Sequence, residues 1–403
     1  MTFGPTPQER AMQAREVILR VLSGELTWLQ GADILGWSPR TMRRWRSRWL
    51  KWGVDGLRDR RRRPSPRRAA GKEVTPVLRL YRGRYRGFNV RHFHAVLCRE
   101  HGFRYSYSFL RQLLQTAGLV KKKRPRGRHR LRREPRAQFG ELLHLDGSPH
   151  VWLALRPQER CCLISVVDDA TKRLLYAHLV EQESSQAVFE ALAAVFATQG
   201  LPMALYTDRA SWAAFTPKAG EPVDKTRRTQ VGRALHRLGV EHILAYSPQA
   251  RGRSERINRT LQGRLVNELR VARIRTLEAA NRYLQERFLP AHNQEFVRPP
   301  VDPIPAFAPV SPFDLAQILC FQEQRVVGKD NTVVWEARRL QIPRQPGRAT
   351  CAGLEVLVRR HLNGSYSVWR GTRPLATFDP RGRLLTPKTQ TAPALQSPVG
   401  AVA

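Results

Sequence analysis

Three carboxylates occupy positions from which they could act together on one substrate. Asp146 ends the apolar segment LLHLD, and Asp208 ends a second apolar segment, ALYTD. Residues at the ends of adjacent strands can converge on one point. Glu255 follows the turn-forming segment SPQARGRS at the beginning of a predicted helix. We therefore expect Asp146, Asp208 and Glu255 to form one acidic, catalytic cluster.

The charge of the whole chain indicates what such a cluster would act on. The 403 residues include 70 Lys and Arg against 33 Asp and Glu, a net charge of +37. Such an excess of positive charge predicts a polyanionic partner. Three carboxylates in so basic a protein are explained if they bind divalent metal. Two Mg²⁺ ions, with Mn²⁺ as a substitute, would activate the attacking oxygen and stabilise the leaving oxygen at a phosphodiester.

Other candidate sites are weaker. Asp168 and Asp169 follow a strand and precede Thr171, which is typical of a capped turn. His144 lies on the same strand face as Asp146, where a structural histidine is the simpler interpretation. A zinc module is disfavoured because its spacing is wrong and a second nearby cysteine is missing; its candidate ligands would be His92, His94, Cys98 and His101.

The helix that begins near Glu255 carries further polar side chains on the same face. Arg259 could contact a DNA phosphate, while Asn258 or Gln262 could reach sugar or base edges. Arg251, just before this helix, is also expected to contact DNA.

Residues 1–62 are predicted to form a helix-turn-helix DNA-binding domain. Ser38 and Pro39 mark the start of its third helix, in which Met42 and the tryptophans recur at inward-facing positions. The other faces are basic, as in a recognition helix, although a solvated basic helix in a small bundle is the alternative. The residues of this region expected to contact DNA are Arg40, Arg43, Arg44, Arg46, Arg48, Arg61, Arg62 and Arg63.

A chain of further segments follows the first domain. Residues 63–73 are predicted to be a basic linker and residues 74–120 a second helical DNA-binding module, which ends near Gly118. Residues 121–137 form a basic arm that would lie along phosphates, beginning with Lys121, Lys122 and Lys123.

From residue 138 the pattern changes to apolar strands separated by turns. Three sequential strands, a helix and a fourth strand predict a mixed α/β core over residues 138–300. A Pro-rich linker is expected over 301–324, a small β-barrel over 325–380 and a disordered tail over 381–403. The chain is therefore expected to be multidomain, with all-α modules, an α/β core and a β-barrel.

Two classes of protein are disfavoured by composition. The five cysteines form no CxxC pair, so we expect no disulfides and a reducing compartment. No apolar run approaches the length of a membrane span, and the first residues do not form a secretory signal.

The segments LHLDGSPHVW, YTDRASWAAF and SPQARGRSERINRTLQGRLVNELR resemble the three catalytic blocks of DDE transposases in the retroviral-integrase superfamily. TWLQGADILGWSPRTMRRWRSRWLKWGVDGLRDR is similar to the N-terminal helix-turn-helix of the ISNCY group of bacterial insertion-sequence transposases. The resemblance implies an RNase H-like core with Asp146, Asp208 and Glu255 as its triad. One departure is the run from Arg209 to Trp212, where a small polar run containing glycine is expected.

The resemblance implies an enzyme that binds the terminal inverted repeats of its element, cuts DNA there and joins the freed end to target DNA. Such an enzyme would act as a homo-oligomer on double-stranded DNA, in the cytoplasm of a bacterium and associated with the nucleoid. Two alternatives are a DNA-binding regulator or inactive relic of an element, and a nuclease of the same fold that does not join strands.

Overall fold

The computed structural model describes residues 7–57, 69, 71–122, 134–215, 227–245 and 254–385. The chain divides into two compact units, Met1–Val77 and Leu78–Ala403. Five residues that the sequence predicts to contact DNA lie outside the described residues: Arg61, Arg62, Arg63, Lys123 and Arg251. Most of the predicted linker 63–73 and most of the tail 381–403 also lie outside them.

The first unit is a small helical bundle. It contains α1 (Pro7–Leu22), α2 (Trp28–Ile34), α3 (Pro39–Trp52) and α4 (Val54–Leu57). Thr27 and Gln30 form a capping box that begins α2, and the Ser38 side chain accepts from the Thr41 amide to begin α3. Met42 is fully buried, so α3 packs inward as its spacing predicts.

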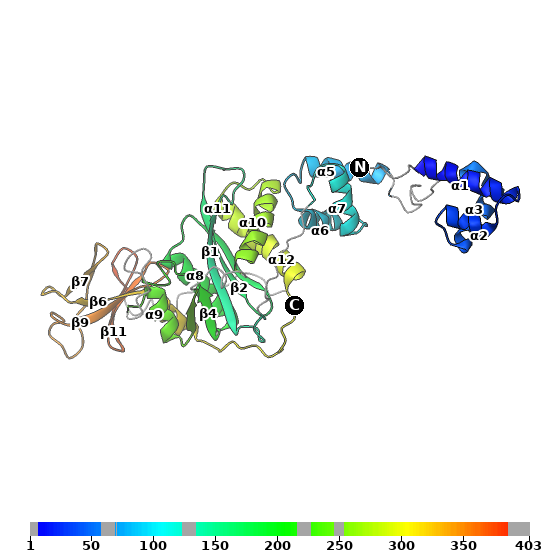
Figure 1. The fold of residues 1–403 in the computed structure, drawn as a ribbon. Helices are drawn as coiled ribbons and strands as arrows, with labels where there is room; N and C mark the ends of the chain where they lie inside the picture. The colour runs from blue at the N-terminus through cyan, green and yellow to red at the C-terminus, as the bar shows by residue number, and fades with distance from the viewer. Residues whose placement is uncertain are drawn as a thin grey trace. The chain divides into compact units, whose positions relative to one another are not determined.

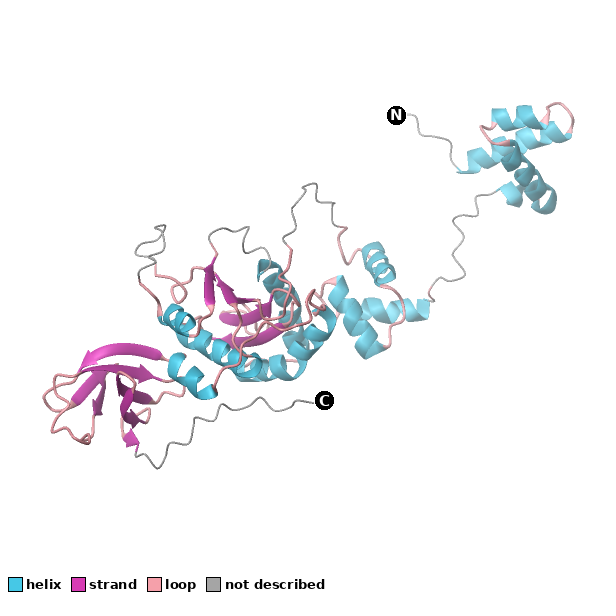
Figure 2. Cartoon of the chain, turned by 90° about the horizontal axis from the view of Figure 1, so that it is seen from below, coloured by secondary structure: helices cyan, strands magenta, loops and turns pink. Residues whose placement is uncertain are grey.

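A second group of helices precedes the sheet. It consists of α5 (Gly71–Arg82), α6 (Val90–His101) and α7 (Tyr107–Thr116). Asn89 and Ser106 cap α6 and α7 through their side-chain oxygens. Gly102 ends α6 in the left-handed conformation that glycine adopts readily. Figure 2 shows helices and no strands among the described residues of the two helical groups, α1–α4 and α5–α7.

The predicted α/β core is present as a five-stranded mixed sheet of order β3-β2-β1-β4-β5. β1 (Leu142–His150) pairs antiparallel with β2 (Cys161–Asp168), which pairs antiparallel with β3 (Leu174–Val180). On its other side β1 pairs in parallel with β4 (Ala204–Thr207), which pairs in parallel with β5 (Glu241–Leu244). Parallel pairing requires crossovers, and these contain α8 (Ser185–Gln199) and α9 (Gln230–Arg237).

Helices cover both faces of this sheet (Figure 1). On one face, α8 and α9 form an apolar core with alternate residues of β1, β2 and β4. On the other face lie α10 (Ser254–Val271), α11 (Leu277–Tyr283), the π-helical turn η3 (Leu284–Phe288) and α12 (Leu289–Phe296). The sequence predicts one helix from Thr276 to His292, and the structure interrupts that helix with η3.

The segment 301–324, expected to be a Pro-rich linker, packs against the α/β core. It contains α13 (Pro312–Ile318), and Leu315 and Leu319 are buried in the same apolar cluster as α8. The Arg233 guanidinium on α9 donates 2.6 Å to the Cys320 carbonyl. The C-terminal strands are therefore joined to the core by packing as well as by the chain.

The C-terminal strands form an open sheet rather than the expected closed barrel. β6 (Phe321–Val326), β9 (Glu355–Arg360), β10 (Tyr366–Arg370), β11 (Arg373–Phe378) and β12 (Leu384–Leu385) pair in the order β12-β11-β10-β9-β6. A separate hairpin, β7 (Thr332–Trp335) and β8 (Arg338–Gln341), packs its apolar side chains against this sheet. Closure would require the two edge strands to pair, and among the described strands β12 is too short to provide such an edge.

None of the helices in the described ranges combines the length and the apolar character that crossing a membrane demands.

The packing of α12 predicts how stability depends on pH. His292 is 8% exposed between Phe288 and Phe296, and burial, with a contribution from Arg264, lowers its pKa to about 4. The unfolded chain, with a histidine pKa near 6.5, therefore binds more protons between pH 6.5 and 4. The stability of the folded chain therefore decreases as the pH is lowered from 6.5 to 4.

Between pH 7 and pH 5, we expect His292→Leu to lose about 2 kcal/mol less stability than the wild type loses, because leucine does not bind a proton. The measurement is urea unfolding of the full chain at both pH values, followed by circular dichroism. His236→Leu, at an exposed position of α9, serves as the control and should keep the wild-type pH dependence. Equal pH dependence in all three proteins would contradict this role of His292.

Candidate active site

Asp146 lies within β1, which continues to His150 instead of ending at Asp146 as the sequence predicts, and Asp208 directly follows β4, the neighbouring strand. The parallel register aligns Leu142 with Ala204 and His144 with Tyr206. The pairing ends there, two residues before Asp146 and Asp208. Because side chains alternate along a strand, Asp146 belongs to the sheet face that α10 covers.

Each of these two carboxylates is held by a donor in its surroundings. Asp146 is only 6% exposed, and its Oδ2 accepts a 2.7 Å hydrogen bond from Nδ2 of Asn258 on α10. Asp208 Oδ1 accepts a 3.0 Å hydrogen bond from the backbone amide of Ala210. Asn258 therefore joins α10 to the strand that carries Asp146.

Glu255 lies in the first turn of α10 and is exposed. It precedes Asn258 by three residues, so the two side chains lie on one helix face, one turn apart. One turn beyond Asn258, Gln262 donates a 3.0 Å hydrogen bond to the Ser148 hydroxyl on β1. The helix thus runs along β1 with its Glu255 end toward the two aspartates.

In the structure, Asp146, Asp208 and Glu255 do not form a metal-binding cluster. Among the described residues, no three His, Cys, Asp or Glu side chains lie close enough together to hold a metal ion. Carboxylates repel one another when no cation separates them. Asn258 and Gln262, which the sequence predicts as DNA contacts, donate hydrogen bonds to Asp146 and Ser148 on β1.

The C-terminal half of α10 is anchored by residues of the second helical group. Glu268 accepts hydrogen bonds from His92 Nε2 at 2.7 Å and from the Tyr283 hydroxyl at 2.9 Å. Burial would raise the pKa of Glu268, but the hydrogen bonds from His92 and Tyr283, together with the charges of His92 and Arg99, outweigh it and lower the pKa. Arg270 donates 2.6 Å to the Arg86 carbonyl. These contacts attach α10 to α6 and to the turn before it.

Asp168 and Asp169, which the sequence disfavours as a metal site, both accept hydrogen bonds within the core. Asp168 accepts hydrogen bonds from the Thr171 amide and hydroxyl and from the Gly140 amide, which is the predicted capped turn. Burial raises the pKa of Asp168, although these donors oppose the shift. Asp169 accepts from His144 Nε2 at 2.9 Å, and both side chains are buried. His144 is therefore structural.

The four candidate zinc ligands make other contacts. His92 bonds to Glu268, His94 to the Tyr105 carbonyl, and His101 to the Tyr85 hydroxyl. Cys98 Sγ lies 3.8 Å from His94 Nε2. These residues of the described chain are spread over two sides of α6, as their helical spacing requires.

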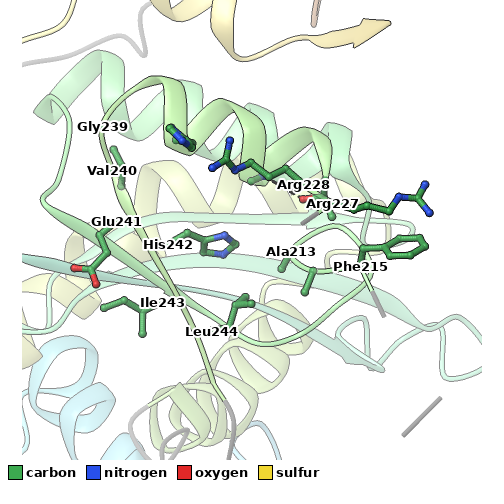
Figure 3. A pocket seen from close by; sticks show the side chains of 14 residues that line it. Ala213, Phe215, Arg227, Arg228, Gly239, Val240, Glu241, His242, Ile243 and Leu244 are labelled. Atoms are coloured by element: carbon green, nitrogen blue, oxygen red, sulfur yellow. Dashed lines mark hydrogen bonds between the residues drawn. The ribbon is translucent and has the colours of Figure 1, made fainter. Parts of the chain in front are cut away.

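A hollow of about 880 Å³ lies beside the segment that follows Asp208 (Figure 3). It is lined by Ala213–Phe215, the start of α9 and strand β5. The Arg227 guanidinium lies 4.0 Å above the Phe215 ring, and Arg228 lies next to it. His242 contacts the Thr207 hydroxyl at 2.8 Å, and burial lowers its pKa to about 4. The two arginines therefore supply most of the positive charge of this hollow.

The basic residues of α3 lie on the surface of the first unit. Arg40, Arg43, Arg44 and Arg46 are exposed, and Arg48 is half-buried. The guanidiniums of Arg46 and Arg48 lie 5.1 Å from Trp28 and 5.5 Å from Trp45. In the second unit, Lys121, Lys122 and Arg259 are exposed. All of these cations are thus accessible to a polyanion.

Two residues that sequence reasoning did not single out lie behind the acidic pair. Glu183 precedes α8, and its Oε1 accepts a 2.6 Å hydrogen bond from the Trp212 indole. Trp212 belongs to the run after Asp208 that departs from the expected pattern. The sequence signal for this contact is Gly147, directly after Asp146, because a glycine within a strand often marks a place where another group approaches the backbone closely.

A helical unit with an exposed basic helix, and an α/β unit with Asp146 in β1 and Asp208 just after β4, define a DNA-binding protein with a candidate catalytic core. A model of the helix-turn-helix domain matches residues 15–65. The protein named "Putative transposase y4bF" of Sinorhizobium fredii is 34% identical over 379 residues, covering 92% of this chain and 81% of that protein. The chain belongs to the bacterial insertion-sequence transposases.

A second relative is the "Transposase for insertion sequence IS1202" of Streptococcus pneumoniae. It is 27% identical over 368 residues, covering 82% of this chain and 78% of that protein. Among solved structures, the chain is similar to one in the simian T-cell lymphotropic virus intasome with PP2A regulatory subunit B56 gamma. That match has 14% identity and a TM-score of 0.32, and covers 77% of this chain and 99% of the other. We draw nothing about function from so low a score.

The exposed arginines of α3 predict a specific salt dependence of DNA binding. The double variant Arg43→Ala/Arg44→Ala removes two exposed cations from α3. We expect the slope of log affinity against log salt concentration to fall by about two, as each phosphate contact contributes about one. Fluorescence anisotropy with a labelled duplex, titrated over a range of salt concentrations, measures this slope.

Arg20→Ala is the matched control, since Arg20 is exposed on α1 beside Glu25. Its slope should equal that of the wild type. An unchanged slope in the α3 double variant would show that this helix does not contact phosphates.

Proposed function

We propose that this transposase cuts DNA at the ends of its insertion sequence and joins the freed ends to target DNA, with Asp146, Asp208 and Glu255 as its catalytic carboxylates. The observation that supports the proposal is the parallel pairing of β1 with β4, which makes the strand of Asp146 the neighbour of the strand that Asp208 follows, while Asn258 of α10 binds Asp146. The RNase H-like classification of the core belongs to the same proposal, supported by the mixed strand order β3-β2-β1-β4-β5.

The donor set suits Mg²⁺, with Mn²⁺ as a substitute. Asp146, Asp208 and Glu255 offer carboxylate oxygens, which are the ligands that Mg²⁺ prefers. The near-complete burial of Asp146 would be costly for a charged group without a compensating cation or donor. Two bound ions would activate an attacking oxygen and stabilise a leaving oxygen at the scissile phosphodiester.

The residues around the carboxylates orient them for this task. Asn258 directs one oxygen of Asp146 toward α10, and the Ala210 amide fixes one oxygen of Asp208. Glu255 is exposed at the start of α10, where it can move toward the two aspartates while Gln262 keeps the helix on β1. Arg259, exposed in the next turn, is suited to contact a phosphate of the bound strand.

Cutting would use water, and joining would use the 3′-hydroxyl that cutting releases. Both nucleophiles come from outside the protein, so the same carboxylates can serve both steps without a covalent protein–DNA intermediate.

Recognition of the DNA ends is assigned to residues 1–136. The helix-turn-helix match, the exposed arginines of α3 and the exposed Lys121 and Lys122 support this assignment. Because two ends must be joined in one reaction, the active form is proposed to be a homo-oligomer assembled on double-stranded DNA.

Two other functions make different predictions. A regulator or an inactive relic of an element would bind the same DNA without cutting it. A nuclease of the same fold would cut but not join. The helix-turn-helix unit, suited to recognition of a specific site, favours the transposase over a general nuclease.

We expect the wild-type chain with Mg²⁺ to cut a labelled duplex carrying the ends of the element and to form joined products. Asp146→Asn, Asp208→Asn and Glu255→Gln should each reduce both reactions by at least about a thousandfold, because each removes a metal-binding charge. DNA affinity, measured by gel shift, should remain within about threefold of the wild type. Removal of Mg²⁺ by a chelator should abolish both reactions, and Mn²⁺ should restore them.

Glu278→Gln, an exposed carboxylate at the start of α11, is the control and should cut and join as the wild type does. DNA binding without cutting or joining by the wild type would favour the regulator. Cutting without joining would favour the nuclease.

A further inference from the structure

Gly147, Glu183 and Trp212 meet on the opposite side of β1 from α10. Gly147 follows Asp146 in the strand, Glu183 lies between β3 and α8, and Trp212 lies in the segment after Asp208. Side chains alternate along β1, so a side chain at position 147 would point away from the face that carries Asp146. Trp212 accordingly packs in the apolar cluster formed with α8.

The contact among these three residues is close. The indole N–H of Trp212 donates 2.6 Å to Glu183 Oε1, and Trp212 is only 4% exposed. A Cβ atom built on Gly147 would lie 2.5 Å from each carboxylate oxygen of Glu183. Any side chain at position 147 would therefore displace the Glu183 carboxylate from the indole.

The segment that Trp212 anchors begins at Asp208. The Ala210 amide donates to Asp208 Oδ1, and the Ala213 and Ala214 amides donate to the Ala210 carbonyl. This short turn joins Trp212 to Asp208 through consecutive hydrogen bonds. A shift of Trp212 would thus move the turn and the carboxylate that it holds.

Glu183 is also within electrostatic reach of a buried group beside Asp146. Burial, then the charge of Glu183 and more weakly that of Asp146, raise the pKa of the Cys162 thiol to about 12. Cys162 pairs with Pro149 on β1. Glu183 therefore lies close behind the strand that carries Asp146, whereas Asn258 contacts Asp146 from the other face.

We propose that Glu183 is a positioning residue, which binds the Trp212 indole against Gly147 and so keeps Asp208 level with Asp146. This inference rests on the proposed function of the two aspartates. It explains why the run Arg209–Trp212 can depart from a glycine-containing pattern, since a buried tryptophan fixes the turn in place of a backbone preference. Glycine is needed at position 147 instead, because a side chain there would occupy the space of the Glu183 carboxylate.

The test compares Glu183→Ala, Glu183→Gln and Trp212→Phe in the full chain. Gln keeps an oxygen that accepts from the indole, whereas Ala removes it and Phe removes the donor while keeping a large ring. We expect Glu183→Ala and Trp212→Phe to lower kcat for DNA cutting by about tenfold to a hundredfold, because small misplacements of reacting groups have effects of this size. KM for the DNA should stay within about twofold, and Glu183→Gln should recover most of the lost rate.

The double variant Glu183→Ala with Trp212→Phe should be no slower than the slower single variant, since both changes break one contact. Glu181→Ala, at an exposed position two residues away, is the matched control and should match the wild type. Equal losses in Glu183→Gln and Glu183→Ala would overturn the proposal and assign the role to the negative charge. A wild-type rate in Trp212→Phe would also overturn it.

Hydrogen exchange measured by mass spectrometry provides a readout that does not depend on activity. Peptides covering residues 208–215 should exchange at least about tenfold faster in Glu183→Ala and Trp212→Phe, and at close to the wild-type rate in Glu183→Gln. Unchanged exchange in all variants would overturn the proposal. If the wild type did not cut DNA, the proposed function would fail, and the exchange data would still decide whether Glu183 holds this turn.

Discussion

The parallel pairing of β1 with β4 is the constraint on which the candidate site depends. The two strands are separated in sequence by β2, β3 and α8, and only their pairing brings the strand of Asp146 next to the strand that Asp208 follows. Parallel strands require such a crossover, so the α8 core and the acidic pair are consequences of one topology. The strong apolar cluster under α8 keeps this pairing in one register.

The helix α10 connects this site with the rest of the second unit. Near its start, Asn258 and Gln262 bond to β1, and near its end Glu268 and Arg270 bond to residues of the second helical group. Between them, Leu261, Leu265 and Leu269 are fully buried against the sheet and α11. Because α10 is attached at both ends, it links the second helical group to the carboxylate in its first turn.

The C-terminal part is integrated with the core more closely than its composition indicates. Prolines suggested a linker over 301–324, but Leu315 and Leu319 are buried under α8 and Arg233 bonds to the backbone at Cys320. Proline prevents regular backbone pairing without preventing side-chain packing. The strands that follow form an open sheet covered by a hairpin, which buries their apolar faces without closing a barrel.

Local sequence signals determined much of this protein. The spacing of Met42 and the cap at Ser38 predicted the third helix of the first unit, and the apolar runs before Asp146 and Asp208 predicted β1 and β4. These features depend on contacts between residues near in sequence. Tertiary structure alone decided that Asn258 and Gln262 bind β1, that residues 301–324 pack on the core, and that Glu183 meets Trp212 behind Gly147. Such contacts join residues distant in the chain, and no local propensity encodes which of many polar or apolar side chains will be neighbours once the sheet has formed.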